Sequence, residues 1–365
     1  MNLKLLSPLA LALPLTLPLA LSGCGEQSAQ AMETINLRVG ASHPETLPWV
    51  GAISDHFIPE VDRRIAERGL GYRINWQESY GGQLYKANAT LSSVSLGIVD
   101  LGWVFSTLEG SNQPLTQVTA YTPGVTDDPA IMMDVFNELN RTVPALKAEW
   151  EGNNTVFLGA SASDPFQIFT TFPLDSLDDL QGQKISAAGV LSSWLRGTGA
   201  VGVQGALPDF YMQVQTGVSD GSLVLPSGAF SIKLQEVAPH LTKVNLGSTY
   251  FGGLAINKDT FEGLPEELQE ILVEAGDVYS EHVGAGAMGL YDQGMAAMEE
   301  NSDVTLATWS EEQTREWIDS LPNLAKEWVE DNRARGLPAD EVLAAYMDAM
   351  RDRGIEPLRA WDEEL

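Results

Sequence analysis

The sequence predicts an α/β fold built from about two domains. The chain has 365 residues, and domains usually hold about 100 to 200 residues each. From residue 34 onward, short runs with strand-like alternation are interleaved with longer runs of helical spacing. Strands that alternate with helices pair mainly in parallel, so an α/β architecture is expected.

The first expected elements follow one another closely, and each is bounded by turn residues. Period-two alternation or a short apolar run indicates a strand, and apolar spacing of three or four residues indicates a helix. Expected strands are residues 34–42, 72–79 and 98–105, and expected helices are residues 49–69 and 87–97.

The same criteria divide the rest of the chain, and its last part is mostly helical. Strands are expected at residues 154–162, 166–172, 183–189 and 222–226, with a strand-rich stretch at 240–257. Helices are expected at residues 190–200, 207–217, 264–301, 309–321 and 339–350. The helix at 264–301 is the longest predicted element.

The N-terminus indicates an export signal. Lys4 gives a short basic start, and residues 5–21 are almost wholly apolar. Their prolines and short span argue against a transmembrane helix. Leu-Ser-Gly-Cys, ending at Cys24, resembles the lipobox of bacterial lipoproteins. We therefore expect cleavage after residue 23, lipidation of Cys24 and a membrane anchor; ordinary cleavage near residues 29–31 is the alternative.

Cysteine content and charge exclude several classes of protein. Cys24 is the only cysteine, so the mature chain has no internal disulfide. Acidic residues number 50 against 21 basic ones, a net charge of −29. Nucleic acid is an unsuitable partner, because phosphate binding needs a basic surface. The acidic residues are dispersed along the chain, as on a solvated protein surface. In concentrated salt the repulsion between their carboxylates is screened, so we prefer the interpretation that the source organism is adapted to salt.

No catalytic, metal or cofactor motif is found. The segment GVSDG (217–221) has the G-x-S-x-G spacing of a nucleophile elbow around Ser219. Such an elbow needs a strand before it and a helix after it; here the predicted order is reversed, so a helix cap and turn are favoured. The four histidines show no metal-ligand spacing, and no Walker or dinucleotide fingerprint is present. An exported serine hydrolase using Ser219 is kept only as the alternative of another class.

Three groups of motifs carry a resemblance to a known family. They are HPE, YGGQL and SLGIVDLGWV within residues 35–110, LDSLDDLQGQKIS and LPDFYMQVQTGVSDG within 174–226, and LAINKDTFEGLPEELQEILVEA at 254–275. Their order and spacing resemble the solute-binding component of tripartite ATP-independent periplasmic (TRAP) transporters, of the dicarboxylate-binding, DctP-like type.

The resemblance implies a two-domain periplasmic-binding-protein (Venus flytrap) fold with hinge strands and a long domain-spanning helix. Residues 1–23 would be the signal peptide and 24–33 a tether. Domain I would comprise 34–157 and 250–285, and domain II 158–249 and 286–365. It also implies a non-enzymatic periplasmic receptor without cofactor or metal. Its partners would be a small-molecule solute, the transporter's membrane subunits and, through Cys24, a lipid anchor.

One departure from the family pattern affects the expected solute. Relatives usually hold an organic acid with an arginine at the end of the strand written here QKIS, and this sequence has Ser186 there. A second basic position is occupied by Phe166. Arg196 lies nearby but is expected to be solvated. Without a guanidinium, a carboxylate would lose hydration with little compensation.

The expected solute site is therefore aromatic. The predicted ligand-binding residues are Trp49, Trp103, Phe105, Phe166, Ser186, Asp209, Tyr250 and Phe251. Aromatic faces attract an ammonium group, with Asp209, Glu45 or Asp164 as candidate counter-charges. We expect a small amine or amino alcohol such as ethanolamine. Two alternatives remain: an organic acid bound without the arginine clamp, or rings that belong to the core and an Asp209 that only caps its helix.

Overall fold

The computed structural model describes residues 32–365; the predicted signal peptide, Cys24 and all but the last two residues of the predicted tether lie outside this range. The strands are β1 (Glu33–Gly40), β2 (Tyr72–Ser79), β3 (Leu101–Phe105), β4 (Thr155–Ala162), β5 (Gln167–Thr170), β6 (Lys184–Ala188), β7 (Val201–Gly205), β8 (Gly221–Val224), β9 (His240–Lys243), β10 (Tyr250–Asn257) and β11 (Thr305–Thr308). The α-helices are α1 (Pro48–Ala52), α2 (Ile58–Glu67), α3 (Thr90–Ser95), α4 (Pro129–Thr142), α5 (Pro144–Gly152), α6 (Leu207–Gln215), α7 (Pro226–Ser231), α8 (Lys258–Glu262), α9 (Glu266–Glu299), α10 (Glu311–Ser320), α11 (Leu324–Ala334) and α12 (Ala339–Asp352).

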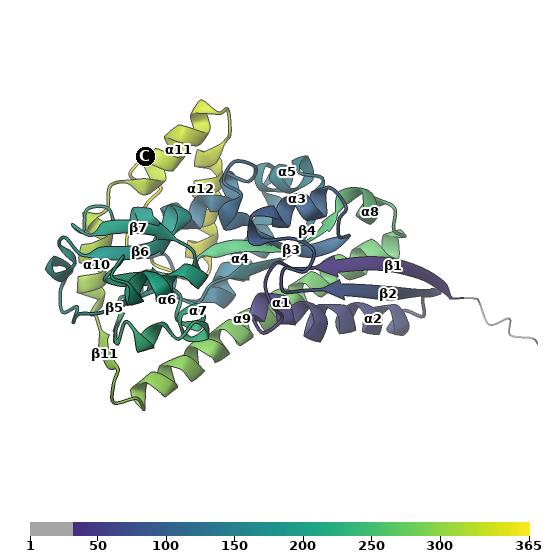
Figure 1. Cartoon of the computed structure of the whole chain (residues 1–365). Coiled ribbons are helices and arrows are strands. Elements are labelled where there is room, and N and C mark those ends of the chain that lie inside the picture. Colours follow the sequence, from purple (N-terminus) through teal and green to yellow (C-terminus); the bar gives the residue numbers. More distant parts are fainter. Residues whose placement is uncertain (1–31) are drawn as a thin grey trace, which may run out of the picture.

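Two mixed sheets organise these elements. The first has the strand order β2-β1-β3-β10-β4 and the second β11-β9-β5-β8-β6-β7. We call the parts built around them the first and second lobes; they lie on opposite sides of Figure 1. The α/β class is confirmed, and the long helix was also correctly predicted. The domain limits given above stay predictions.

Strand direction differs from the parallel pairing that was expected. β1 is parallel to β2 and β3, but β10 is antiparallel to both β3 and β4. In the second sheet β5 is antiparallel to β8 and β9. The antiparallel strands adjoin the segments that cross between the lobes. A strand that arrives from the other lobe enters its sheet from the opposite end, which reverses its direction.

The crossing segments are residues 163–166 and 244–249. They are bonded to each other, with Ser163 N donating to Thr249 O at 2.9 Å and Phe166 N donating to Gly247 O at 3.0 Å. Residues 124–126 lie beside them, because Ser248 N donates to Thr126 O at 2.7 Å. The connection between the lobes is thus a short ribbon of paired backbone.

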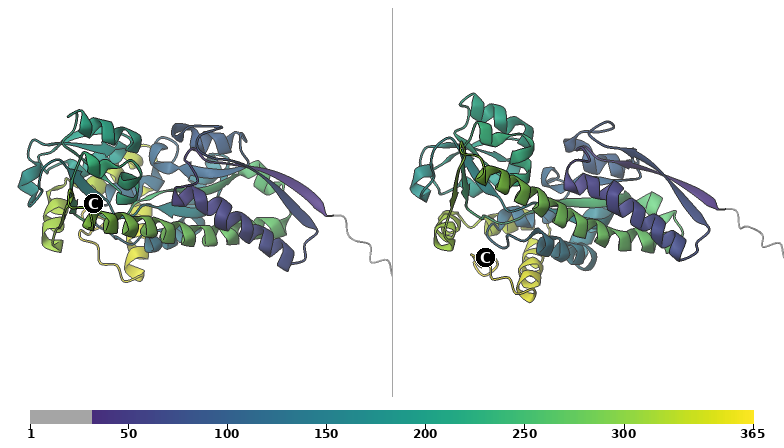
Figure 2. Two further views of the ribbon diagram at one scale, coloured as in Figure 1. Left: turned by 60° about the horizontal axis from the view of Figure 1, so that its bottom comes forward. Right: turned by 90° about the horizontal axis from the view of Figure 1, so that it is seen from below.

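Helix α9 runs along both lobes, as the views in Figure 2 show. Its 34 residues correspond to a length of about 50 Å. In the first lobe Gly276 packs directly against the backbone of Leu158 in β4, and in the second Gly294 packs against the ring of Phe230 in α7. No helix within residues 32–365 is long and apolar enough to cross a membrane.

Two glycines of α9 offer a matched test of this packing. A Cβ at Gly294 would overlap the Phe230 ring, whereas a Cβ at Gly289 would meet no atom within 4 Å. We expect Gly294→Ala to lower the free energy of unfolding by about 1–3 kcal/mol through overpacking. Gly289→Ala should raise it by up to about 1 kcal/mol, because alanine favours a helix. Urea denaturation measures both, and a loss of equal size in the two variants would contradict this packing.

Candidate functional site

Five aromatic rings form a cluster at the edge of the first sheet where the parallel strands β1 and β3 end. We call His43, Trp49, Trp103, Phe105 and Phe251 the aromatic cluster. Trp103 stacks on Phe105 with ring centroids 5.2 Å apart, and His43 meets Trp103 edge-on at 5.0 Å. Trp49 lies 5.1 Å from Phe251 and 5.9 Å from Trp103. The carboxyl edge of parallel strands is the usual place for a ligand in an α/β fold.

Local structure explains how residues so distant in sequence meet. Trp103 and Phe105 occupy alternate positions of β3, so their side chains share one face. The start of β10 pairs with the end of β3 through Gly252 and Phe105, which brings Phe251 alongside. Trp49 lies in the first turn of α1, and its carbonyl accepts from the Tyr279 hydroxyl of α9 at 2.7 Å.

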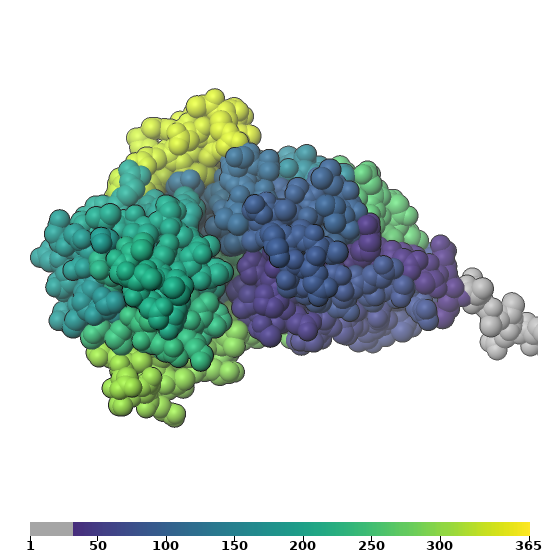
Figure 3. Space-filling view, in the orientation of Figure 1, coloured from purple at the N-terminus to yellow at the C-terminus, as the bar shows by residue number. Residues whose placement is uncertain are grey.

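The cluster is a packed wall rather than an open cage. Trp49, Trp103 and Phe251 are buried, whereas His43 and Phe105 are partly exposed. A cation binds a ring from within about 6 Å of its centroid, so rings on opposite sides of a cation lie further apart than the 5–6 Å found between these centroids. A solute would therefore bind against the exposed side, toward His43 and Phe105. Figure 3 shows a furrow where the two lobes meet.

The cluster contains no positive charge. Burial lowers the pKa of His43 to about 4, so its imidazole is neutral at pH 7. Apart from Arg73, which lines a hollow beside α2 and β2, every arginine in residues 32–365 has a carboxylate or backbone partner outside the cluster. Arg196, for example, pairs with Glu327 of α11 at 2.5 Å, as expected of a solvated group.

Charged groups of both signs lie at the rim. Gly81 N donates to His43 O at 2.8 Å, which holds the loop after β2 against the loop after β1. Glu45 and Glu78 line a hollow of about 410 Å³ there, together with Tyr80. Lys86 donates to Gly82 O at 3.0 Å in the same region. A charged solute at the cluster would experience both carboxylates and this ammonium.

The structure does not bring all the predicted site residues together. Phe166 is buried on a crossing segment and meets Trp194 of the second lobe edge-on at 5.4 Å. Tyr250 stacks on Phe136 of α4 at 4.0 Å, and its hydroxyl accepts from Asn140 at 3.3 Å. Tyr250 thus packs on α4, whereas its neighbour Phe251 packs on Trp49 in the cluster.

Ser186 and Asp209 already have partners within the second lobe. Ser186 is fully buried, and its hydroxyl bonds with Gln213 Oε1 at 2.7 Å and Ser219 Oγ at 2.9 Å. Its hydroxyl is thus engaged within the second lobe, and its contact with a solute stays a prediction. The Asp209 carboxylate is exposed and accepts from Ala206 N at 3.0 Å. This is the helix-capping arrangement that was the alternative for this residue.

Two other acidic or nucleophilic candidates are also accounted for. Asp164 is fully buried and accepts from Ser227 N at 2.9 Å and Ser227 Oγ at 2.6 Å. Ser219 is buried after α6, and Gly217 has φ +72°, which fits the predicted helix cap. Strand β8 follows rather than precedes this turn, so no nucleophile elbow forms.

Sequence reasoning missed His43 and Gln213. His43 follows the end of β1, and its place in HPE immediately after a strand was a usable signal. Gln213 lies on α6, where nothing local indicated that its side chain would close over Ser186.

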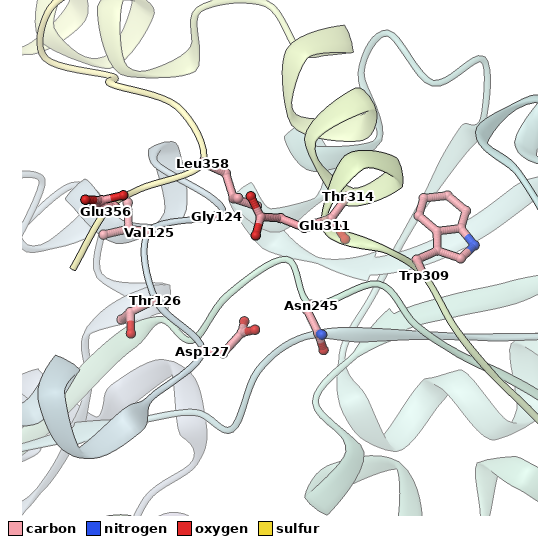
Figure 4. A pocket seen from close by; sticks show the side chains of 10 residues that line it. All are labelled: Gly124, Val125, Thr126, Asp127, Asn245, Trp309, Glu311, Thr314, Glu356 and Leu358. Carbon is pink, nitrogen blue, oxygen red and sulfur yellow. The ribbon is translucent and has the colours of Figure 1, made fainter.

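A separate hollow of about 290 Å³ lies beside the crossing segments (Figure 4). Asp127, Glu311 and Glu356 line it with Asn245 and Trp309. None of the predicted site residues lines this hollow, and no basic side chain does. We assign no solute to it.

Comparison with known proteins identifies the class. Residues 64–332 match the family of bacterial extracellular solute-binding proteins, family 7 (DctP). The chain belongs to this family and is a solute-binding protein rather than an enzyme, as its motifs predicted.

Relatives with known names agree with this assignment. The C4-dicarboxylate-binding periplasmic protein DctP of Rhodobacter capsulatus is 28% identical over 176 residues, which is 47% of this chain and 52%, about half, of that relative. The ectoine-binding periplasmic protein TeaA of Halomonas elongata is 23% identical over 280 residues, 74% of this chain and 80% of the relative.

Solved structures share the fold at low identity. A TRAP periplasmic solute-binding protein from Desulfovibrio salexigens has a TM-score of 0.74 at 22% identity, covering 87% of this chain and 95% of its own. One from Rhodoferax ferrireducens, in complex with copurified benzoate, has a TM-score of 0.72 at 18% identity, covering 88% and 98%. The predicted two-lobed binding-protein fold is therefore confirmed.

The buried carboxyl group of Asp164 should make the stability of the fold depend on pH. Burial raises its pKa from 3.8 to about 6. The folded chain thus holds this proton more tightly than the unfolded chain, and the free energy of unfolding should fall as the pH rises between these values, by no more than about 3 kcal/mol. We expect Asp164→Asn to flatten this slope in urea denaturation between pH 4 and 7, whereas the exposed control Asp303→Asn should keep it. An unchanged slope in Asp164→Asn would contradict the assignment.

Proposed function

We propose that this protein is the extracytoplasmic receptor of a TRAP transporter, which binds one small organic solute between its lobes and delivers it to the membrane subunits. The observation that carries the proposal is the uncharged aromatic cluster at the carboxyl edge of the first sheet, facing the second lobe. The proposed location is the periplasm, with an anchor through lipidated Cys24.

The solute class follows from the charges. Four rings, those of Trp49, Trp103, Phe105 and Phe251, offer π-faces or edges, and each ring face attracts an ammonium by about 0.5 to 2 kcal/mol. The cluster supplies no guanidinium to offset the dehydration of a carboxylate. Glu45 and Glu78 at the rim would favour a cation. The proposed solute is a small amine or amino alcohol such as ethanolamine.

The proposed contacts are those that the structure allows. Trp49, Trp103, Phe105 and Phe251 form the wall of the first lobe, and Phe166 beside Trp194 is the proposed aromatic contribution from the crossing segment. Ser186, Asp209 and Tyr250 keep their intramolecular partners and are left out of the proposed site.

A second candidate is an organic acid bound without an arginine clamp. Lys86 at the rim supports it. So do the names of proteins with the same fold, which include complexes with benzoate, mandelate and pyroglutamic acid. The name of the ectoine-binding periplasmic protein TeaA gives a further solute among the relatives.

Solute binding should couple to lobe closure. The lobes are joined by the paired crossing segments, by α9 and by the buried bond from Trp194 Nε1 to Ala120 O at 2.7 Å. A solute that touches both lobes binds the closed arrangement better and increases its population. The closed form is the one proposed to dock on the membrane subunits.

A thermal-shift screen of amines, amino alcohols and organic acids tests the solute class. A solute at 100 times its dissociation constant stabilises the folded state by about 2.7 kcal/mol. We expect ethanolamine or a close analogue to raise the melting temperature, and dicarboxylates to leave it unchanged. Shifts from acids but not from amines would contradict the amine proposal and favour the second candidate.

Lys86→Gln separates the two candidates independently. Removing an ammonium near a bound charge changes affinity by about two- to threefold in water-like surroundings. An amine should bind the variant more tightly, and an acid more weakly, in isothermal titration. Lys326→Gln on the exposed face of α11 serves as the control and should change neither affinity. Tighter acid binding by Lys86→Gln would contradict a role for this ammonium.

A further inference from the structure

The indole N–H of Trp49 has no acceptor, which sets it apart from the other tryptophans. The chain has nine tryptophans, and all lie in the part that the structure describes. Every one except Trp49 donates its Nε1–H to an oxygen: Trp76 to Asp62, Trp103 to Ser161, Trp150 to Asn140, Trp194 to Ala120, Trp309 to Leu174, Trp317 to Trp194, Trp328 to Pro114 and Trp361 to Pro123. Trp49 Nε1 is buried without a partner among the described residues.

A buried indole N–H without an acceptor is difficult to explain if the tryptophan only packs in the hydrophobic core. Buried polar groups are nearly always hydrogen-bonded, and each exception calls for an explanation. A hydroxyl can rotate toward a partner, but an indole nitrogen only donates, in the plane of its ring. The Trp49 ring is also held in place by Phe251 at 5.1 Å, and its backbone carbonyl is bound to the Tyr279 hydroxyl.

Trp103, in the same cluster, gives the contrast. Its ring lies 5.9 Å from that of Trp49, and its Nε1 donates to Ser161 Oγ at 2.9 Å within the first lobe. In the proposed solute wall, the indole N–H of Trp103 thus has a hydrogen-bond acceptor among residues 32–365, whereas the indole N–H of Trp49 has none there.

We infer that Trp49 is a specificity-determining residue whose indole N–H donates to an oxygen of the bound solute. The inference rests on the proposed solute site and narrows its ligand to an ammonium compound that also carries an acceptor oxygen, such as an amino alcohol or a zwitterion. The partly exposed His43 ring on the loop after β1 lies 6.3 Å from the Trp49 ring, measured between centroids.

Isothermal titration of ethanolamine and ethylamine, which differ in one hydroxyl, tests the inference. Trp49→Phe keeps an aromatic ring and removes the N–H, so it should lower the affinity for ethanolamine about three- to tenfold, the effect of one hydrogen bond. The affinity for ethylamine should fall by less, because ethylamine has no oxygen that could lose a bond and shares only the change of ring. Trp103→Phe is the matched control and should keep the wild-type ratio of the two affinities. A wild-type ratio in Trp49→Phe overturns the inference.

The same variants distinguish failure of the amine proposal from failure of this inference. If neither amine binds and benzoate does, the proposed solute class is wrong, and Trp49→Phe should still lower benzoate affinity about three- to tenfold. An unchanged benzoate affinity overturns the inference.

A further readout needs no solute. Both substitutions remove the same ring area from the core and should lower the melting temperature, but Trp103→Phe should lower it more, because it also breaks a buried bond to Ser161. Equal losses in the two variants would show that the Trp49 N–H is already bonded, for example to a buried water, and would overturn the inference.

Discussion

A neutral aromatic surface at the boundary of the two lobes is the constraint on which the proposed function depends. The chain carries 50 acidic and 21 basic residues, so carboxylates are available to pair with almost every guanidinium on the surface. Arg353, for example, is held by Asp134 and Glu138. The cluster excludes such charges, and burial keeps its one titratable ring, His43, uncharged at neutral pH. What the site offers a solute is π-surface and a single unpaired donor.

The fold places this surface where binding can move the lobes. The cluster lies at the ends of β1 and β3 in the first lobe, and one of the paired crossing segments, residues 244–249, ends two residues before Phe251. Asp164 ties the other crossing segment to Ser227 of α7 in the second lobe. A solute held between the lobes therefore acts close to the hinge, where a small change in contacts shifts the balance between open and closed forms.

Periodicity predicted most elements, but not their directions. The alternation in YRINWQES gave β2 with its observed bounds, because a period of two needs only local residues. β10 is antiparallel to its neighbours because the chain reaches it from the other lobe. No local sequence pattern encodes this crossing. The four-residue strand β11 was missed, since it pairs only at the edge of the second sheet beside β9. In the site, Phe251 packs on Trp49 of the cluster but Tyr250 stacks on Phe136 of α4, a difference that depends on tertiary packing. The burial of Ser186 depended on Gln213, which lies 27 residues further along the chain.

A crystal structure of the full chain with its copurified or soaked solute is the most direct test. We expect electron density for a compact ammonium compound against Trp103 and Phe105, with an oxygen within hydrogen-bonding distance of Trp49 Nε1 and no guanidinium in contact. A carboxylate bound by an arginine from any part of the chain would contradict the account. The site would then be built to hold an anion, not the ammonium compound proposed from its rings.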